Sequence, residues 1–105
     1  MATGASMLAA YGLLNGQTAT THHAYQRSMQ KKYPAVHFVS GTRFVESGKI
    51  ATAGGLTSGV DLALHIVARY YGAEVGEVTA NFLEYHSELW KNPQYEPVKP
   101  VAAAK

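Results

Sequence analysis

The sequence predicts an α/β protein that contains only part of a parallel sheet. Helical periodicity alternates with short stretches rich in β-branched residues, the order expected when parallel strands are joined through helices. Ile50–Ala53 runs without charge, as a strand buried on both faces should. Besides a small hairpin, the chain offers one other candidate for a parallel strand, Gln17–Thr20, so we expect few strands and an incomplete sheet.

The first helix and the first strand follow from local signals. Ala5–Leu14 carries apolar residues at helical spacing, and Asn15–Gly16 is a typical helix end. The β-branched stretch Gln17–Thr20 then predicts a strand. The apolar face of this helix is expected to contain Met7, Leu8, Tyr11 and Leu14.

A second helix is expected to open at Thr21 or His22 and to run to about Lys32. It stops there because Pro34 disfavours the helical conformation at the residue before it, Tyr33. The side chains expected to face inward are Ala24, Tyr25 and Met29.

The middle of the chain predicts a hairpin-like excursion that leads into the buried strand. Val36–Val39 and Arg43–Glu46 are typical of strands, with turn residues between them. Ile50–Ala53 follows a second turn, and Gly54–Gly55 come directly after it. Two glycines at this point permit unusual backbone angles and tight contact across the top of the sheet. They lack the spacing and the lysine of a phosphate-binding loop.

Two helices close the predicted domain. Gly59–Tyr71 is the longest, with Thr57 or Ser58 as its cap and Gly72 at its end. Glu74–Tyr85 follows, with acidic residues in its first turn that suit the helix dipole. The residues expected in the core are Val60, Ala63, Leu64, Val67 and Tyr71 in the first helix, and Val75, Val78, Phe82 and Tyr85 in the second.

Composition limits the classes of function. At 105 residues the chain forms at most one domain, and a net charge of +2 does not imply binding to nucleic acid or to a membrane surface. There are no cysteines, which excludes disulfides, thiolate metal sites and thiol catalysis within this chain. No apolar run reaches the length of about 18 residues that predicts a membrane span, and no signal peptide is apparent, so we expect a cytoplasmic protein.

Five segments, in matching order and spacing, resemble the ThiJ/PfpI family of the class I glutamine amidotransferase-like superfamily. They are Thr3–Ala5, Gly12–Gly16, Ala19–His22, Arg43–Gly55 and Thr57–Val67. The likeness is greatest to the isocyanide hydratase-like branch and to the sensor domains that precede some helix-turn-helix regulators. It implies the C-terminal half of a flavodoxin-like parallel α/β sandwich over residues 1–90, followed by a Pro/Ala-rich flexible tail over 91–105.

The chain departs from the family at the position that carries the chemistry. Relatives place a cysteine nucleophile just before the Thr-Gly step, where this sequence has Ala2. The N-terminal half, with its first strands and the acid beside the cysteine, is also expected to be missing. We therefore expect a non-catalytic domain. Two alternatives stay open: a truncated hydratase-like or amidase-like enzyme for small carbon–nitrogen compounds, and the ligand-sensing domain of a transcriptional regulator.

The resemblance implies a remnant of the family site. His22 matches the histidine near the nucleophile, which favours a location near the site, without a catalytic role, over that of a plain helix-start residue. Thr3 and Gly4 match the step that offers backbone donors to an oxyanion, or they simply initiate the helix. With Gly54 and Gly55, Gly4 is expected to border a small-molecule ligand. No cofactor is implied, and no metal site is expected because no two histidines share a helix at a spacing of four.

An incomplete sheet needs a partner. Strand edges and apolar helix faces should be exposed, so we expect either a homo-oligomer or a complementary N-terminal half. The aromatic side chains expected in the core or at such an interface are Tyr70, Tyr71, Phe82, Tyr85 and Trp90.

Overall fold

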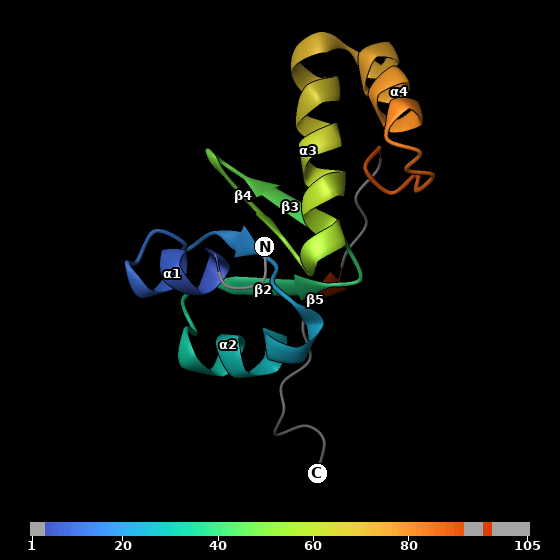
Figure 1. Cartoon of the computed structure of the whole chain (residues 1–105). Helices are drawn as coiled ribbons and strands as arrows, with labels where there is room; N and C mark the ends of the chain where they lie inside the picture. The colour runs from blue at the N-terminus through green and yellow to red at the C-terminus, as the bar shows by residue number, and fades with distance from the viewer. Residues whose placement is uncertain (1–3, 92–95, 98–105) are drawn as a thin grey trace.

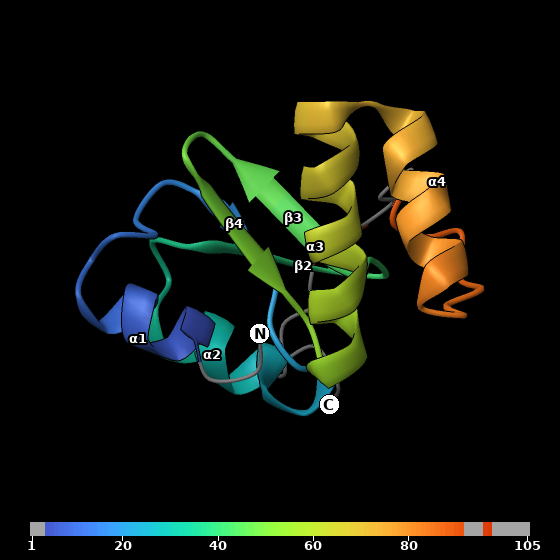
Figure 2. The same cartoon turned by 45° about the horizontal axis from the view of Figure 1, so that its top comes forward.

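The protein is a mixed assembly of helices and short strands, as predicted, and its sheet is incomplete. The computed structural model describes residues 4–91 and 96–97. In chain order the elements are α1 (Gly4–Ala10), β1 (Thr18–Ala19), the 3-10 helix η1 (His23–Tyr25), α2 (Gln26–Lys32), β2 (His37–Ser40), β3 (Phe44–Ser47), β4 (Ile50–Ala53), α3 (Leu56–Tyr71), α4 (Ala73–Phe82) and β5 (Glu96–Pro97). The helices α1 and α2 lie on one side of β2, and α3 and α4 lie on the other (Figure 1 and Figure 2).

The strands form two small sheets. β1 and β2 run parallel, with Thr18 opposite His37, and β5 pairs antiparallel with the far edge of β2, where Pro97 is opposite Val39. β3 and β4 form a separate two-stranded sheet. Of the predicted tail over 91–105, only Lys91 and β5 belong to the described residues.

The pairing predicted for Ile50–Ala53 is wrong. This segment is a strand, but it pairs antiparallel with β3, with Phe44 opposite Ala53, and not within the parallel sheet. The loop between the two strands is only Gly48–Lys49, and Gly48 has a φ of 60°. A connection of two residues joins antiparallel strands only, because a parallel crossover needs a dozen residues or more. The parallel partner of β1 is therefore β2.

The hairpin contacts β1 through side-chain hydroxyl groups. The backbone N–H of Thr18 donates to Ser47 Oγ over 3.1 Å, and that of Thr20 donates to Thr52 Oγ1 over 2.9 Å. These hydroxyls take the place that the carbonyls of a neighbouring strand would occupy in a ladder. Two N–H groups on the outer edge of β1 thus have hydrogen-bond partners although no strand pairs with this edge among the described residues.

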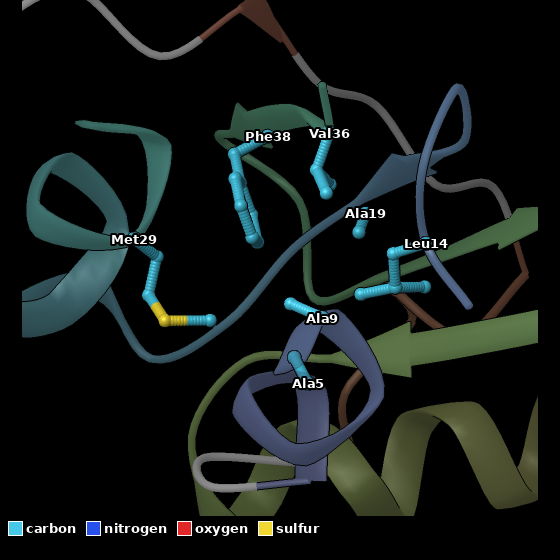
Figure 3. Packing of buried hydrophobic residues seen from close by; sticks show 7 residues of the cluster. All are labelled: Ala5, Ala9, Leu14, Ala19, Met29, Val36 and Phe38. Atoms are coloured by element: carbon cyan, nitrogen blue, oxygen red, sulfur yellow. The ribbon is translucent and has the colours of Figure 1, made fainter. Parts of the chain in front are cut away.

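The first core lies between α1, α2 and the parallel strands (Figure 3). Its buried members are Ala5, Ala9, Leu14, Ala19, Met29, Val36 and Phe38. The small side chains of Ala5 and Ala9, four residues apart, let α1 approach the strands closely. The predicted helix over Ala5–Leu14 is too long, because α1 ends at Ala10 and the chain turns at Gly12 with a φ of 78°.

Part of each predicted apolar face in this half is exposed. Met7 and Tyr11 of the first helix and Ala24 and Tyr25 of the second point to solvent, while Met29 is buried as predicted. Each of these helices is short, so its core face holds only one or two side chains and helical spacing alone does not identify them. The predicted stop at Tyr33–Pro34 is confirmed, since α2 ends at Lys32.

The second core lies between the hairpin, α3 and α4. Its buried members are Phe44, Ala53, Leu64, Ala80 and Trp90. The stripe of α3 that faces it is more polar than predicted, with Ser58 and Asp61 buried beside Leu64, and with Ala63 and Tyr71 exposed. Gly55, and neither Thr57 nor Ser58, is the N-cap residue of α3.

The predicted core face of α4 is also wrong. Val75, Val78 and Phe82 are exposed, and the small residues Gly76 and Ala80 face α3 instead. A Cβ atom on Gly76 would lie only 3.0 Å from the ring of Trp90, so the small residues are what permits this close contact. The apolar stripe and the stripe of small residues both have helical spacing. Only the small side chains fit into the densely packed contact with α3, so this stripe is the buried one. Within the described residues, none of the helices combines the length and the apolar character that crossing a membrane requires.

Candidate functional site

Two connections that are far apart in sequence meet at the N-terminal end of α3. One is the loop that follows β1 and carries His22, and the other is the Gly54–Gly55 step between β4 and α3 (Figure 2). A Cβ atom on Gly55 would lie 3.5 Å from Cδ2 and 3.9 Å from Nε2 of the His22 ring, and one on Gly54 would lie 3.6 Å from the Thr21 carbonyl oxygen. The structure therefore brings together three of the predicted site residues.

The remaining predicted site residues lie at the start of the chain. Ala2 and Thr3 are outside the described residues. Gly4 is the half-buried first residue of α1. The proposed oxyanion step at Thr3–Gly4 thus stays a prediction.

The His22 ring is held by its own backbone neighbourhood. Its Nδ1 accepts a hydrogen bond from the backbone N–H of Ala24 over 3.0 Å, which makes it the cap of η1. The ring also stacks on His23 with centroids 4.5 Å apart. Because Nδ1 accepts, the proton of the neutral ring resides on Nε2. The nitrogen near Gly55 is therefore a hydrogen-bond donor and not a free base.

Buried hydroxyl and amide groups fix the loop that leads to His22. Thr20 and Thr21 are buried, and Thr20 Oγ1 donates to the Val39 carbonyl oxygen over 2.9 Å. The side-chain amide of Gln26 donates to Thr20 Oγ1 over 3.3 Å and to the Thr21 carbonyl oxygen over 3.1 Å. The loop is thus tied to β2 on one side and to α2 on the other, which orients His22.

The start of α3 is partly exposed to solvent: Leu56 and Thr57 are exposed, whereas Ser58 is buried and its N–H donates to the Gly55 carbonyl oxygen over 3.0 Å. No side chain caps its first turn among the described residues, and Leu56 is 92% exposed. The first N–H groups of a helix are donors without helical partners, and they lie at the positive end of the helix dipole. Together with Nε2 of His22, this end of α3 offers hydrogen-bond donors where the two connections meet.

An ion pair with a buried carboxylate, next to the site, was missed by the sequence analysis. Asp61 is fully buried, and its Oδ2 accepts from Nε of Arg43 and from the hydroxyl of Tyr85, each over 2.7 Å. Arg43 also donates to Thr57 Oγ1 over 2.8 Å, and Ser87 donates to Asp61 Oδ1 over 3.2 Å. The sequence signal was an acidic residue in the inward stripe of α3, three residues before Leu64.

The environment of this ion pair holds Arg43 and Tyr85 protonated. Burial alone would lower the pKa of Arg43, but the hydrogen bond and the charge of Asp61 outweigh it and raise the pKa. For Tyr85, burial and the hydrogen bond to Asp61 both raise the pKa. The network therefore fastens the first turn of α3, through Thr57, to the hairpin and to the segment after α4.

Two concavities lie away from the His22 loop. One of about 390 Å³ separates the tip of the hairpin from α3 and is lined by Glu46, Lys49, Ile50 and Tyr70 among others. The other, of about 410 Å³, is lined by residues of α3 and α4 and by Trp90. No group of three or more potential metal-binding side chains gathers in the part of the chain that the structure describes.

Comparison with known proteins identifies two kinds of relative, although no family model matches the chain. Isonitrile hydratase of Pseudomonas putida is 36% identical over 84 residues, which are 79% of this chain and 35% of that protein. The HTH-type transcriptional regulator CdhR of Pseudomonas aeruginosa is 32% identical over 82 residues, 77% of this chain and 24% of the regulator. The HTH-type transcriptional regulator GbdR of the same species is 28% identical over 83 residues, 79% and 22% respectively.

The chain spans about a third of the length of the hydratase and about a quarter of that of the regulators. The predicted likeness to an isocyanide hydratase and to helix-turn-helix regulators is confirmed over this part. The similarity covers most of this chain and a minor part of each relative.

Proposed function

We propose that the chain is the C-terminal part of a ThiJ/PfpI-type domain that binds a small molecule and performs no cysteine chemistry of its own. The observation that carries this proposal is the convergence of His22 with Gly54–Gly55 in a sequence without cysteine. Similarity to a hydratase and to regulators supports a common domain rather than one shared reaction. We also propose a cytoplasmic location, which rests on composition.

The chemistry of the site favours a ligand with an acceptor atom. Nε2 of His22 is the donor in the neutral ring, and the first turn of α3 adds backbone donors at the positive end of a helix. A general base needs an unprotonated nitrogen that faces the reacting proton. In this conformation the unprotonated nitrogen of His22 is occupied by Ala24. The site is thus suited to binding and polarising a small carbonyl, carboxylate or isonitrile compound.

Ligand binding is tested by NMR titration of the ¹⁵N-labelled chain with a small alkyl isonitrile and, separately, with the corresponding formamide. We expect shifts confined to the amides of Gly54, Gly55 and Leu56 and to the loop around His22. The variant His22→Ala should lose them, whereas His86→Ala, at an exposed histidine outside this loop, should keep them. Shifts that are absent, or that survive in His22→Ala, would contradict the binding site.

The enzymatic alternative is favoured by the 36% identity to isonitrile hydratase and is tested separately. Position 2 corresponds to the nucleophile of the family, so the matched pair is the natural chain and its Ala2→Cys variant. Formation of a formamide from an isonitrile by the natural chain would refute the non-catalytic proposal. Activity in Ala2→Cys alone would show that the site needs only the thiol.

We further propose that the exposed face of α4 is an association surface, with a second copy as its occupant. In α4, Phe82 is 87% exposed and Val78 66%, and Val75 of the same helix and its C-cap residue Leu83 are also exposed. Tyr71, the last residue of α3, is 74% exposed. A fully exposed aromatic side chain carries roughly 150–250 Å². At these exposed fractions the two aromatic side chains supply roughly 240–400 Å², about a third to a half of the roughly 800 Å² per partner that a standard interface buries, and the three aliphatic side chains add to it. A complementary N-terminal half is the other occupant, and it would compete for the surface.

A further inference from the structure

His65 of α3 lies between the hairpin and the segment that follows α4, outside the site at His22. Its Nε2 is 2.7 Å from Glu46 Oε1 on β3, and its Nδ1 is 3.0 Å from the Trp90 carbonyl oxygen. The side chain is 20% exposed, and its ring packs against Phe44 with centroids 4.6 Å apart. One imidazole thus connects three parts of the chain.

Both partners of this ring are hydrogen-bond acceptors. A backbone carbonyl oxygen has no proton to donate, so Nδ1 must donate to Trp90. Partial burial raises the pKa of Glu46, but hydrogen bonds from His65 and Arg69 outweigh it and the net pKa is lowered. Glu46 is therefore an ionised carboxylate and Nε2 must donate as well. Two donating nitrogens are present only in the imidazolium form.

We propose that His65 is a pH-sensitive clamp that fastens the Trp90 segment to the hairpin while its ring is an imidazolium. A neutral ring has one N–H. The carboxylate of Glu46 is a stronger acceptor than a neutral carbonyl, so the remaining proton stays on Nε2 and the bond to Trp90 is lost. The clamp therefore opens as pH rises, when the imidazolium gives up one proton.

The charged groups around the ring agree with this direction. Arg69, on α3, donates to Glu46 Oε2 over 2.6 Å and keeps that carboxylate in place. Lys91, after α4, is engaged by Glu77 of α4 over 2.7 Å and by Glu88 over 2.6 Å. Lys91, which directly follows Trp90, is thus already paired, and no other donor among these groups replaces His65.

Opening the clamp should loosen the position of Trp90. Its side chain is 2% exposed, and its ring lies against Gly76 of α4. The indole Nε1 is buried without a hydrogen-bond partner among the described residues, so its burial depends on packing and on the backbone bond to His65. Exchange of this indole proton with water therefore reports on the clamp, and Trp90 is the sole tryptophan in the sequence.

The experiment measures exchange of the Trp90 indole proton by NMR, normalised to the rate of free indole at each pH, between about pH 5 and 8. We expect protection in the natural chain to fall about fivefold as pH rises, the factor that corresponds to one hydrogen bond. In His65→Gln the protection of the indole proton should be low at both the acidic and the alkaline end of this pH range. The control His86→Gln, at an exposed histidine, should follow the natural chain.

A second measurement on the natural chain keeps the proposal falsifiable if His65→Gln does not fold. Long-range ¹H–¹⁵N correlation gives the protonation of each ring nitrogen directly. Both nitrogens of His65 should carry protons at the acidic end, and Nδ1 should lose its proton first. Protection that does not change with pH, an equal fall in His65→Gln, or a bare Nδ1 at the acidic end would each overturn the clamp.

Discussion

The contact between α3 and α4 makes a quantitative prediction at Gly76. Replacing this residue with alanine would place a Cβ atom 3.0 Å from Cζ3 and 3.1 Å from Cη2 of Trp90, and 3.1 Å from the Cβ of Ala68. Neither neighbour can move freely, because Trp90 is 98% buried and the Ala68 Cβ is fixed to the helix backbone. Over-packing of this kind costs about 1–3 kcal/mol. The higher helix propensity of alanine over glycine offsets this cost by about 1 kcal/mol in the free energy of unfolding.

Gly59 in α3 provides the matched control. It lies in a helix interior as Gly76 does, but a Cβ atom there meets nothing within 4 Å. Gly59→Ala should therefore stabilise the protein by about 1 kcal/mol through helix propensity alone. Since the propensity term is common to both variants, Gly76→Ala should be less stable than Gly59→Ala by about 1–3 kcal/mol.

Urea unfolding, followed by the fluorescence of Trp90 at several protein concentrations, measures this difference. The midpoint should rise in Gly59→Ala and fall relative to it in Gly76→Ala, with similar slopes in all three proteins. A Gly76→Ala protein as stable as Gly59→Ala would refute the close packing of α4 on α3. Close packing at Gly76 is also what explains why the apolar face of α4 is exposed, so this explanation would be lost as well.

Three further predictions concern the ion pair, the exposed face and acid. Asp61→Asn should lower the free energy of unfolding by about 1–3 kcal/mol, because it weakens charge-assisted hydrogen bonds in a buried place, while Glu84→Gln at the surface should have little effect. Phe82→Lys should abolish self-association in sedimentation velocity, whereas Met7→Lys on the exposed side of α1 should not; a natural chain that stays monomeric would contradict the surface. Because the pKa of Glu46 is lowered, its contribution to stability is present above the ordinary glutamate pKa and is lost as pH falls through the lowered one; unfolding measured from neutral pH into acid should show this loss, and Glu46→Gln should lack it.

Local signals predicted most elements but not their packing. The stop after Lys32 and the end of α3 at Gly72 follow from residues whose conformational preferences act within a few positions. The helix end predicted at Asn15–Gly16 is wrong, because α1 already ends at Ala10. The face that α4 buries depends instead on the shape of Trp90 and Ala68, which come from elsewhere in the chain. The spacing of Val75, Val78 and Phe82 is equally typical of a core stripe and of an interface.

The ion pair at Asp61 shows a different limit. An acidic residue within an apolar stripe is a signal that can be read from sequence, but its partners lie 18 residues before it and 24 residues after it. Nothing local identifies Arg43 or Tyr85 as those partners. The antiparallel pairing of β4, in contrast, could have been predicted, because the two-residue loop at Gly48–Lys49 permits only a hairpin.

The candidate site depends on two connections, the loop before His22 and the first turn of α3, and different interactions hold each of them in place. Mutations can therefore weaken ligand binding without a large loss of stability. The loop before His22 is held by neutral hydrogen bonds from Gln26, whereas the first turn of α3 is held by the charged network through Thr57. Gln26→Ala should therefore weaken ligand binding with little loss of stability, since only part-buried neutral bonds are removed. Thr57→Val removes one exposed hydrogen-bond acceptor of Arg43. It should weaken ligand binding through the first turn of α3, which forms the other side of the site. If both variants bind the ligand as the natural chain does, the donors that recognise it do not lie at this junction.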